Sequence, residues 1–130
     1  IPGMRKYFAE NPDQMMPILN ENPSYVFFRE TKDGALGATS TELVPGHSVA
    51  IDPSVMPLSG MALIRTEKPV FENGEVKSWE SFSRFAIAHD VGGAIRGPGR
   101  VDVYWGEDAY AEAAGGTMNQ TGELYFAVAP

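Results

Sequence analysis

The chain has 130 residues, with ten Lys or Arg against 17 Asp or Glu, and it contains no cysteine. This length fits one domain, and a hydrophobic content of 43% is enough to build a core without disulfides or metal. The net charge of −7 would repel phosphate backbones, so nucleic acid is not expected as a partner, and the lack of cysteine excludes zinc–thiolate sites and cysteine nucleophiles.

The first 22 residues favour helix. Helix-forming residues are interrupted by Pro12 and Pro17, and Asn11-Pro12-Asp13 is typical of a helix start with proline in the first turn. Two short helices are therefore predicted. Because the chain begins at Ile1 without an initiator Met, we expect residues 1–22 to be a helical lead-in from a preceding, missing domain.

The remainder, residues 23–130, favours strands. Asn73-Gly74 is a strong hairpin turn signal, and Asp52-Pro53 should stop a strand because proline removes a ladder donor. A short helix is predicted over residues 107–114, closing near Gly115-Gly116. Six strands are predicted, at residues 25–28, 47–52, 61–65, 82–89, 101–105 and 123–128. The fold class is therefore mainly β, a barrel or a sandwich.

Residues 89–106 are the strongest candidates for a functional site. Four glycines and a proline lie between Asp90 and Asp102, which suits a shaped loop whose backbone can approach a ligand closely. A plain glycine-rich turn with solvated aspartates is the alternative, since both residue types are common in turns. Asp102, however, is flanked by Val101 and Val103, and burying an ionisable group in an apolar strand costs several kcal/mol unless it is paired or functional.

Several segments together resemble a known family. They are residues 22–28, 48–53, 56–58, 90–97, 101–106 and 122–125, and they include Ser48-Val49-Ala50-Ile51-Asp52-Pro53, Asp90-Val91-Gly92-Gly93 and Val101-Asp102-Val103-Tyr104-Trp105-Gly106. The combination resembles the C-terminal three-aspartate (3D) domain of the membrane-bound lytic murein transglycosylase A family.

The resemblance implies a fold and an activity. The fold would be a six-stranded double-psi β-barrel with short peripheral helices, its amino-terminal strands and a second domain lying in the missing N-terminal part of the same protein. The activity would be cleavage of the β-1,4 bond between N-acetylmuramic acid and N-acetylglucosamine in peptidoglycan glycan strands, forming a 1,6-anhydro sugar without a cofactor. The location would be the periplasm, with an outer-membrane lipid anchor outside this sequence.

The resemblance also implies roles for three aspartates. Asp102 matches the catalytic acid/base, while Asp90 and Asp52 match the two acidic residues that line and support the site. One carboxyl group can protonate the leaving oxygen and then accept a proton from the muramic acid 6-hydroxyl. Asp102 must then start protonated, which its apolar flanks and a nearby Asp90 or Asp52 would favour.

Four further residues are expected to bind substrate. Gly92 and Gly93 would present loop amides, and Tyr104 shares a strand face with Asp102, so it suits the glycan groove while Trp105 suits the core. Arg96, like Arg100, could pair with a glycan carboxyl group, although a solvated loop arginine is equally common.

Two other functions stay open at this point. A double-psi barrel could bind wall polysaccharide without cleaving it, as in expansin-like proteins. The three aspartates could instead converge on calcium or magnesium, although their spacing matches no known cation loop. The two histidines have no metal-ligand spacing, so no metal site is expected from them.

Overall fold

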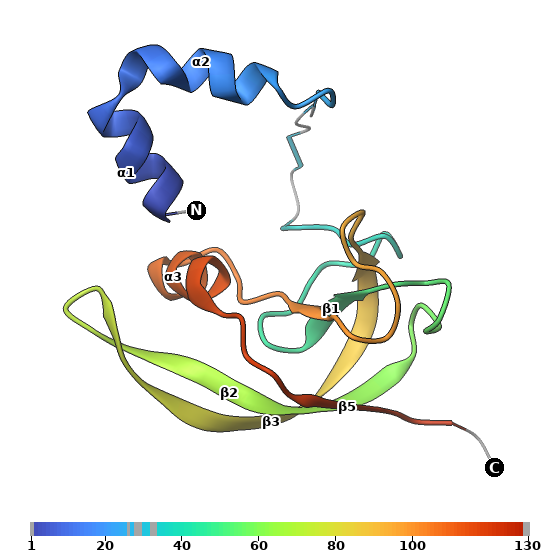
Figure 1. The fold of residues 1–130 in the computed structure, drawn as a ribbon. Helices are drawn as coiled ribbons and strands as arrows, with labels where there is room; N and C mark the ends of the chain where they lie inside the picture. Colours follow the sequence, from blue (N-terminus) through green and yellow to red (C-terminus); the bar gives the residue numbers. More distant parts are fainter. Residues whose placement is uncertain (1, 26, 28–29, 32–33, 129–130) are drawn as a thin grey trace. The chain divides into compact units, whose positions relative to one another are not determined.

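The computed structural model describes residues 2–25, 27, 30–31 and 34–128, and the chain divides into two compact units, Ile1–Lys32 and Asp33–Pro130 (Figure 1). The first unit holds the two predicted helices, α1 (Pro2–Glu10) and α2 (Pro12–Asn20). Pro12 lies in the first turn of α2, where its missing N–H costs nothing. The side-chain amide of Asn11 donates to the Tyr7 carbonyl at 3.0 Å and so closes α1.

The strand predicted over residues 25–28 is wrong at the residues that can be compared. Tyr25 and Phe27 are not in a strand, and their side chains are 81% and 87% exposed. Val26 and Phe28 lie outside the described residues. An aromatic run forms a buried strand only where another strand pairs with it, and the described part of this unit contains only helices and irregular chain.

The second unit is mainly β, as predicted, but its described residues contain five strands rather than six. They are β1 (Ser48–Ile51), β2 (Met61–Glu72), β3 (Glu75–Val91), β4 (Asp102–Val103) and β5 (Glu123–Phe126). They form one mixed sheet in the order β4-β1-β3-β2-β5. Strands β1 and β3 are parallel, and the other neighbours are antiparallel.

The long β2–β3 hairpin forms the largest part of this sheet and curves along one side of the unit (Figure 1). Asn73 and Gly74 have φ values of 55° and 82°, the left-handed pair that a two-residue hairpin turn requires. The turn signal therefore identified the hairpin correctly. Both strands extend well beyond the predicted ranges, because cross-strand pairing continues from Met61↔Ile87 to the turn.

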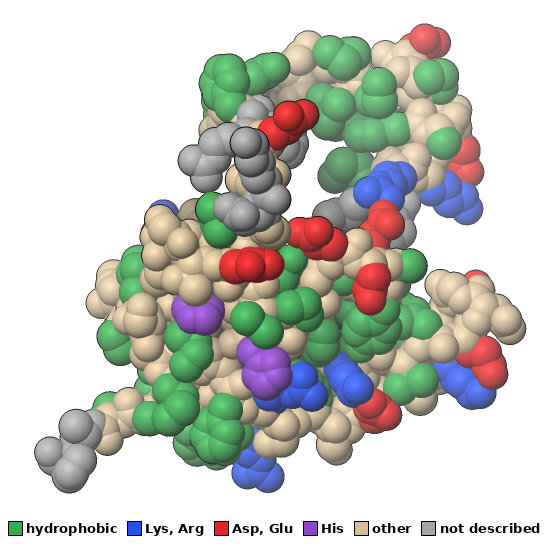
Figure 2. Space-filling model, turned by 180° about the vertical axis from the view of Figure 1, so that it is seen from behind, with side chains coloured by type: hydrophobic (Ala, Val, Ile, Leu, Met, Phe, Trp, Pro, Cys, Tyr) green, Lys and Arg blue, Asp and Glu red, His purple; other side chains and the backbone are tan. Residues whose placement is uncertain are grey.

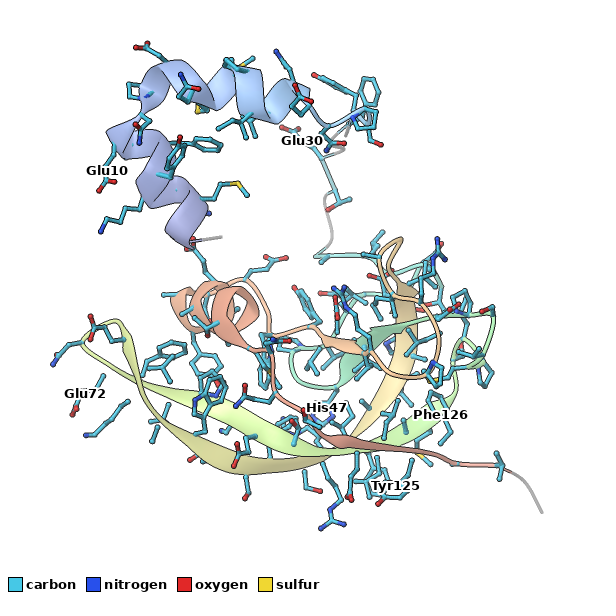
Figure 3. The ribbon with its side chains drawn as sticks, viewed as in Figure 1. Glu10, Glu30, His47, Glu72, Tyr125 and Phe126 are labelled. Carbon is cyan, nitrogen blue, oxygen red and sulfur yellow. The ribbon has the colours of Figure 1, made fainter. Side chains whose placement is uncertain are left out.

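The core lies on one face of the sheet. Its buried members are Val49, Ile51, Met56, Ile64, Ala86 and Ala88, and Val101, Val103, Leu124 and Phe126 pack against them. Alternation decides which side chains join the core: on β5, Phe126 packs inward while Tyr125 points to the other side and is 51% exposed (Figure 3). Strand β1 ends at Ile51, before Asp52-Pro53, as predicted.

Helix α3 (Ala109–Thr117) covers part of the hairpin. The Asp108 carboxylate caps its first turn by accepting from the Ala111 N–H at 2.7 Å, and the Tyr110 hydroxyl donates to the Pro69 carbonyl at 3.1 Å. The predicted helix end near Gly115-Gly116 is wrong, because α3 runs through both glycines to Thr117. None of the helices in the described ranges has the length and apolar character needed to cross a membrane.

The sheet curls without closing. Strands β4 and β5 are its two edges, yet residues of both line the same cavity of about 640 Å³, together with the segments at 98–101 and 118–122. The edges therefore face each other across an opening. The described strands form an incomplete barrel, not the closed six-stranded barrel that was expected.

Candidate active site

Asp52 is a buried carboxylate that fixes the glycine-rich loop. It follows β1 directly and is 4% exposed. Its Oδ2 accepts from the Gly97 N–H at 2.7 Å, and its Oδ1 accepts from the Ser54 N–H at 2.9 Å and hydroxyl at 2.7 Å. The pKa of Asp52 is lowered, most of all by the hydrogen bond from the Gly97 N–H and then by the two hydrogen bonds from Ser54. The charge of Arg96 adds to the lowering, while burial opposes it.

Asp90 lies at the end of β3 and holds a turn at residues 37–40. Its Oδ1 accepts from the Ala38 N–H at 3.0 Å. The neighbouring His89 carbonyl accepts from both the N–H and the hydroxyl of Thr39, each at 3.2 Å. A Cβ on Gly37 would lie 2.4 Å from that carbonyl oxygen, so only glycine allows the turn to approach β3 this closely.

The loop between Asp90 and Asp102 is shaped as its glycines predict. The Ile95 N–H donates to the Gly92 carbonyl at 2.9 Å, and the Ile95 side chain is 1% exposed, which anchors the loop in the interior. Gly97 has a φ of 71°, a conformation that glycine adopts without strain. The loop thus has a fixed path from β3 to β4.

Asp102 opens β4 and pairs with Arg100. The Arg100 Nε donates to Asp102 Oδ1 at 2.9 Å and its Nη2 donates to Oδ2 at 2.8 Å, while the two side chains are 52% and 49% exposed. The expected apolar surroundings of Asp102 are therefore wrong in this structure, although Asp90 lines the same pocket. The side chain points away from Val101 and Val103, which pack on the core, and its nearest charge is positive.

Tyr104 and Trp105 point to different environments, as the alternation predicts. Tyr104 continues beside β1, where its N–H donates to the Ser48 carbonyl at 2.9 Å and its hydroxyl donates to Glu107 at 3.4 Å. Burial first, then Glu107, raises the pKa of the Tyr104 phenol. Trp105 packs against the rings of Phe82 and Tyr110, with centroids 5.3 and 5.9 Å apart, and so belongs to the packing under the hairpin.

One pocket of about 270 Å³ gathers most of the predicted site. Four predicted site residues line it, and they are Asp90, Gly92, Asp102 and Tyr104. Gly93 and Arg96 do not line this pocket: both are exposed on the loop, and Arg96 acts on Asp52 through its charge. Asp52 lies behind the loop rather than in the pocket.

The sequence reasoning missed a side-chain contact between Ser48, which lines this pocket, and His89. The Ser48 hydroxyl, on a fully buried residue, accepts from the Val44 N–H at 2.9 Å and lies 2.8 Å from His89 Nδ1. Ser48 and His89 are 41 positions apart, and only the parallel β1–β3 register brings them together. No local sequence pattern could have indicated the contact.

The structure gives no support to the cation alternative. The carboxylate of Asp52 is occupied by Gly97 and Ser54, and the described ranges hold no group of three or more acidic or histidine residues able to bind a metal ion. Both histidines reach the surface of the rear face (Figure 2), where the His47 Nε2 lies 3.4 Å from Arg84. A cation beside His47 disfavours metal binding there.

A curled, incomplete β-barrel with a glycine loop and two aspartates at one pocket defines a small β domain with an acidic site. A sequence model described as the 3D domain matches residues 47–128. The chain belongs to the 3D domain family, which confirms the resemblance.

Named relatives and solved structures agree with this membership. Membrane-bound lytic murein transglycosylase A of Escherichia coli strain K12 is 34% identical over 113 residues, covering 86% of this chain and 30% of the relative. The crystal structure of MltA from Neisseria gonorrhoeae in its monoclinic form has a TM-score of 0.79 and 34% identity, covering 96% of this chain and 31% of that one. That of E. coli MltA with bound chitohexaose has a TM-score of 0.76 and 30% identity, covering 96% and 38%. The chain thus spans about 30% of the length of the curated relatives it matches.

Proposed function

We propose that the chain is the aspartate-bearing part of a lytic transglycosylase that cleaves the β-1,4 bond between N-acetylmuramic acid and N-acetylglucosamine in peptidoglycan. The observation that carries the proposal is the pocket that joins Asp102, Asp90 and Tyr104 beside a fixed glycine loop. The relatives named lytic murein transglycosylase A and the relative solved with chitohexaose support a glycan as the ligand.

The proposed reaction uses Asp102 twice. As a carboxylic acid it donates its proton to the glycosidic oxygen, and the bond between that oxygen and the anomeric carbon of muramic acid breaks. As a carboxylate it then accepts the proton of the muramic acid 6-hydroxyl, whose oxygen forms the new bond to the anomeric carbon. The product is a 1,6-anhydro sugar, and the acid is regenerated without water or cofactor.

The other predicted residues would serve this step from fixed positions. Asp90 borders the same pocket and is oriented by the Ala38 N–H, whereas Asp52 acts as a positioning residue by holding Gly97 and thus the loop. Tyr104 offers a ring to a sugar face. Gly92 lines the pocket, while Gly93 and Arg96 extend the exposed edge of the loop, where a longer glycan would lie.

The proposal includes the rest of the protein. Residues 1–22 would be a helical lead-in, residues 23–130 would form most of a six-stranded double-psi barrel, and a further N-terminal part would close the opening between β4 and β5. The support is that these edge strands already face each other across one cavity and that the relatives are about three times longer. The protein would act in the periplasm, anchored to the outer membrane by a segment outside this sequence.

The test is mass spectrometry of peptidoglycan digested by the full-length protein, comparing wild type, Asp102→Asn and Glu72→Gln. Losing a general acid and base should slow release of anhydro-muropeptides by at least about 100-fold. Glu72→Gln is the control, because it makes the same acid-to-amide change at the hairpin, in an exposed ion pair with Lys77.

Other products would contradict the proposal in distinct ways. Reducing-end sugars from the wild type would indicate a hydrolase. Binding of peptidoglycan without any product would indicate an expansin-like polysaccharide-binding barrel. An Asp102→Asn variant with the wild-type rate would exclude Asp102 as the acid/base.

A further inference from the structure

The ion pair at the proposed acid conflicts with the first step of the reaction. Arg100 donates one hydrogen bond to each carboxylate oxygen of Asp102, at 2.9 and 2.8 Å. A guanidinium stays protonated at any physiological pH, and this two-bond geometry favours an ionised carboxylate over the acid that the first step needs.

The described acidic and phenolic groups nearest to Asp102 each already have a hydrogen-bond or ion-pair partner. The other charged or titratable residues lining the two cavities that Asp102 borders are Glu123, Asp90 and Tyr104. Glu123 already pairs with Arg65 at 3.3 Å, and Asp90 accepts from Ala38. The Tyr104 hydroxyl donates a hydrogen bond to Glu107. A carboxylate on a ligand would give the guanidinium a partner that has no earlier contact to lose.

We propose that Arg100 is a positioning residue that holds Asp102 in its charged form until a carboxylate on the glycan draws the guanidinium away. Arg100 lines the same 640 Å³ cavity as Asp102, is half exposed, and follows Gly97-Pro98-Gly99 in an irregular segment, so its side chain can turn to a ligand. Guanidinium groups match carboxylates through two parallel hydrogen bonds, and the lactyl group of muramic acid is such a carboxylate when it carries no peptide. This inference rests on the proposed lytic transglycosylase activity.

This restraint of Asp102 by Arg100 would make the enzyme select its substrates by charge. A glycan with free lactyl carboxylates would release Asp102, whereas the same glycan with these groups amidated would leave Arg100 on the acid. We expect wild type to favour the carboxylate form by about tenfold in kcat/KM, since only that form offers the guanidinium a second carboxylate with which to pair.

The experiment uses the full-length protein with glycan strands freed of peptide, either untreated or amidated at the lactyl group. The pH dependence of kcat/KM for anhydro-sugar release is measured for wild type, Arg100→Gln and Arg100→Lys. In Arg100→Gln the basic limb of the pH profile on the amidated glycan should move to higher pH, because the two donors that pair with the Asp102 carboxylate are gone. The preference for the carboxylate form should fall to near unity. Arg100→Lys keeps the charge without the paired bonds and should lie between the two.

Lys77→Gln provides the matched control. Lys77 forms an exposed ion pair with Glu72 at 2.7 Å on the hairpin, and its removal should leave both the basic limb and the preference unchanged. A basic limb that stays in place in Arg100→Gln, or a preference that survives there, overturns the role of Arg100 alone. A wild type that releases no anhydro sugar overturns the proposed function, and the restraint with it.

Discussion

Among the individual side chains, the carboxylate of Asp52 fixes the loop beside the pocket without lining the pocket itself. It receives hydrogen bonds from Gly97 and Ser54 on both oxygens, so it links the end of β1 to the loop that leads to β4. Removing its charge should loosen the loop that places Asp102 and Gly92 at the pocket. Its effect on activity is therefore indirect and should accompany a change in stability.

We predict that Asp52→Asn lowers the melting temperature at pH 7 by on the order of 5 °C, because the amide nitrogen cannot accept a hydrogen bond. The pKa of Asp52 is lowered in the folded protein from its ordinary value of 3.8, so its stabilisation is fully present above that value and is lost as the pH falls through the lower folded value. Calorimetry over a range of pH should show the melting temperatures of wild type and Asp52→Asn converging below pH 3.8. A gap that stays constant down to the acid transition would contradict this role.

The individual residues of the site were predictable to different degrees. The position of Asp52 at a strand end follows from Asp52-Pro53, and the shaped loop follows from its glycines. The Arg100 pair required two side-chain rotamers on an exposed segment, which neither composition nor periodicity determines. Sequence reasoning therefore placed Asp102 beside the glycine loop, but it assumed apolar surroundings in place of the Arg100 pair.

Among the helices and strands, α3 shows tertiary contacts overriding local propensity. Gly115 and Gly116 should end the helix, yet it continues to Thr117, whose hydroxyl donates to the Ala113 carbonyl at 2.8 Å. Tyr110 ties the start of α3 to the hairpin, and Ala114 is fully buried. The packing of this face, rather than the intrinsic preference of its residues, determines the length of α3.

Gly115→Ala should stabilise the protein by roughly 0.5–1 kcal/mol, because alanine loses less backbone entropy in a helix and a new Cβ at Gly115 meets nothing within 4 Å. Denaturant unfolding measures the change. Gly37→Ala is the matched opposite, since its Cβ would meet the His89 carbonyl, and it should cost roughly 1–3 kcal/mol. Equal effects from the two substitutions would exclude this explanation.

For the molecule as a whole, the sequence predicts the fold class better than the closure of the sheet. The hairpin, β1 and β5 follow from apolar runs and turn residues within short windows. The mixed order β4-β1-β3-β2-β5 depends on pairings between distant segments, which local patterns do not encode. The missing sixth strand has the same origin, since Tyr25 and Phe27 have no strand partner in the described chain.

An unpaired sheet edge exposes N–H and C=O groups that another strand can satisfy. If the remaining part of the full-length protein closes the opening between β4 and β5, the outward amides at 102–103 and 123–126 should become hydrogen-bonded there. Hydrogen exchange at these amides should then be at least about tenfold slower in the full-length protein than in residues 33–130 alone. Amides at the centre of the five-stranded sheet, such as Ile64 on β2 and Ala86 on β3, provide the reference, because both proteins contain this pairing. Similar protection at the centre together with slower exchange at both edges would show that the additional chain completes the sheet, whereas unchanged edges would show that the opening remains open to solvent.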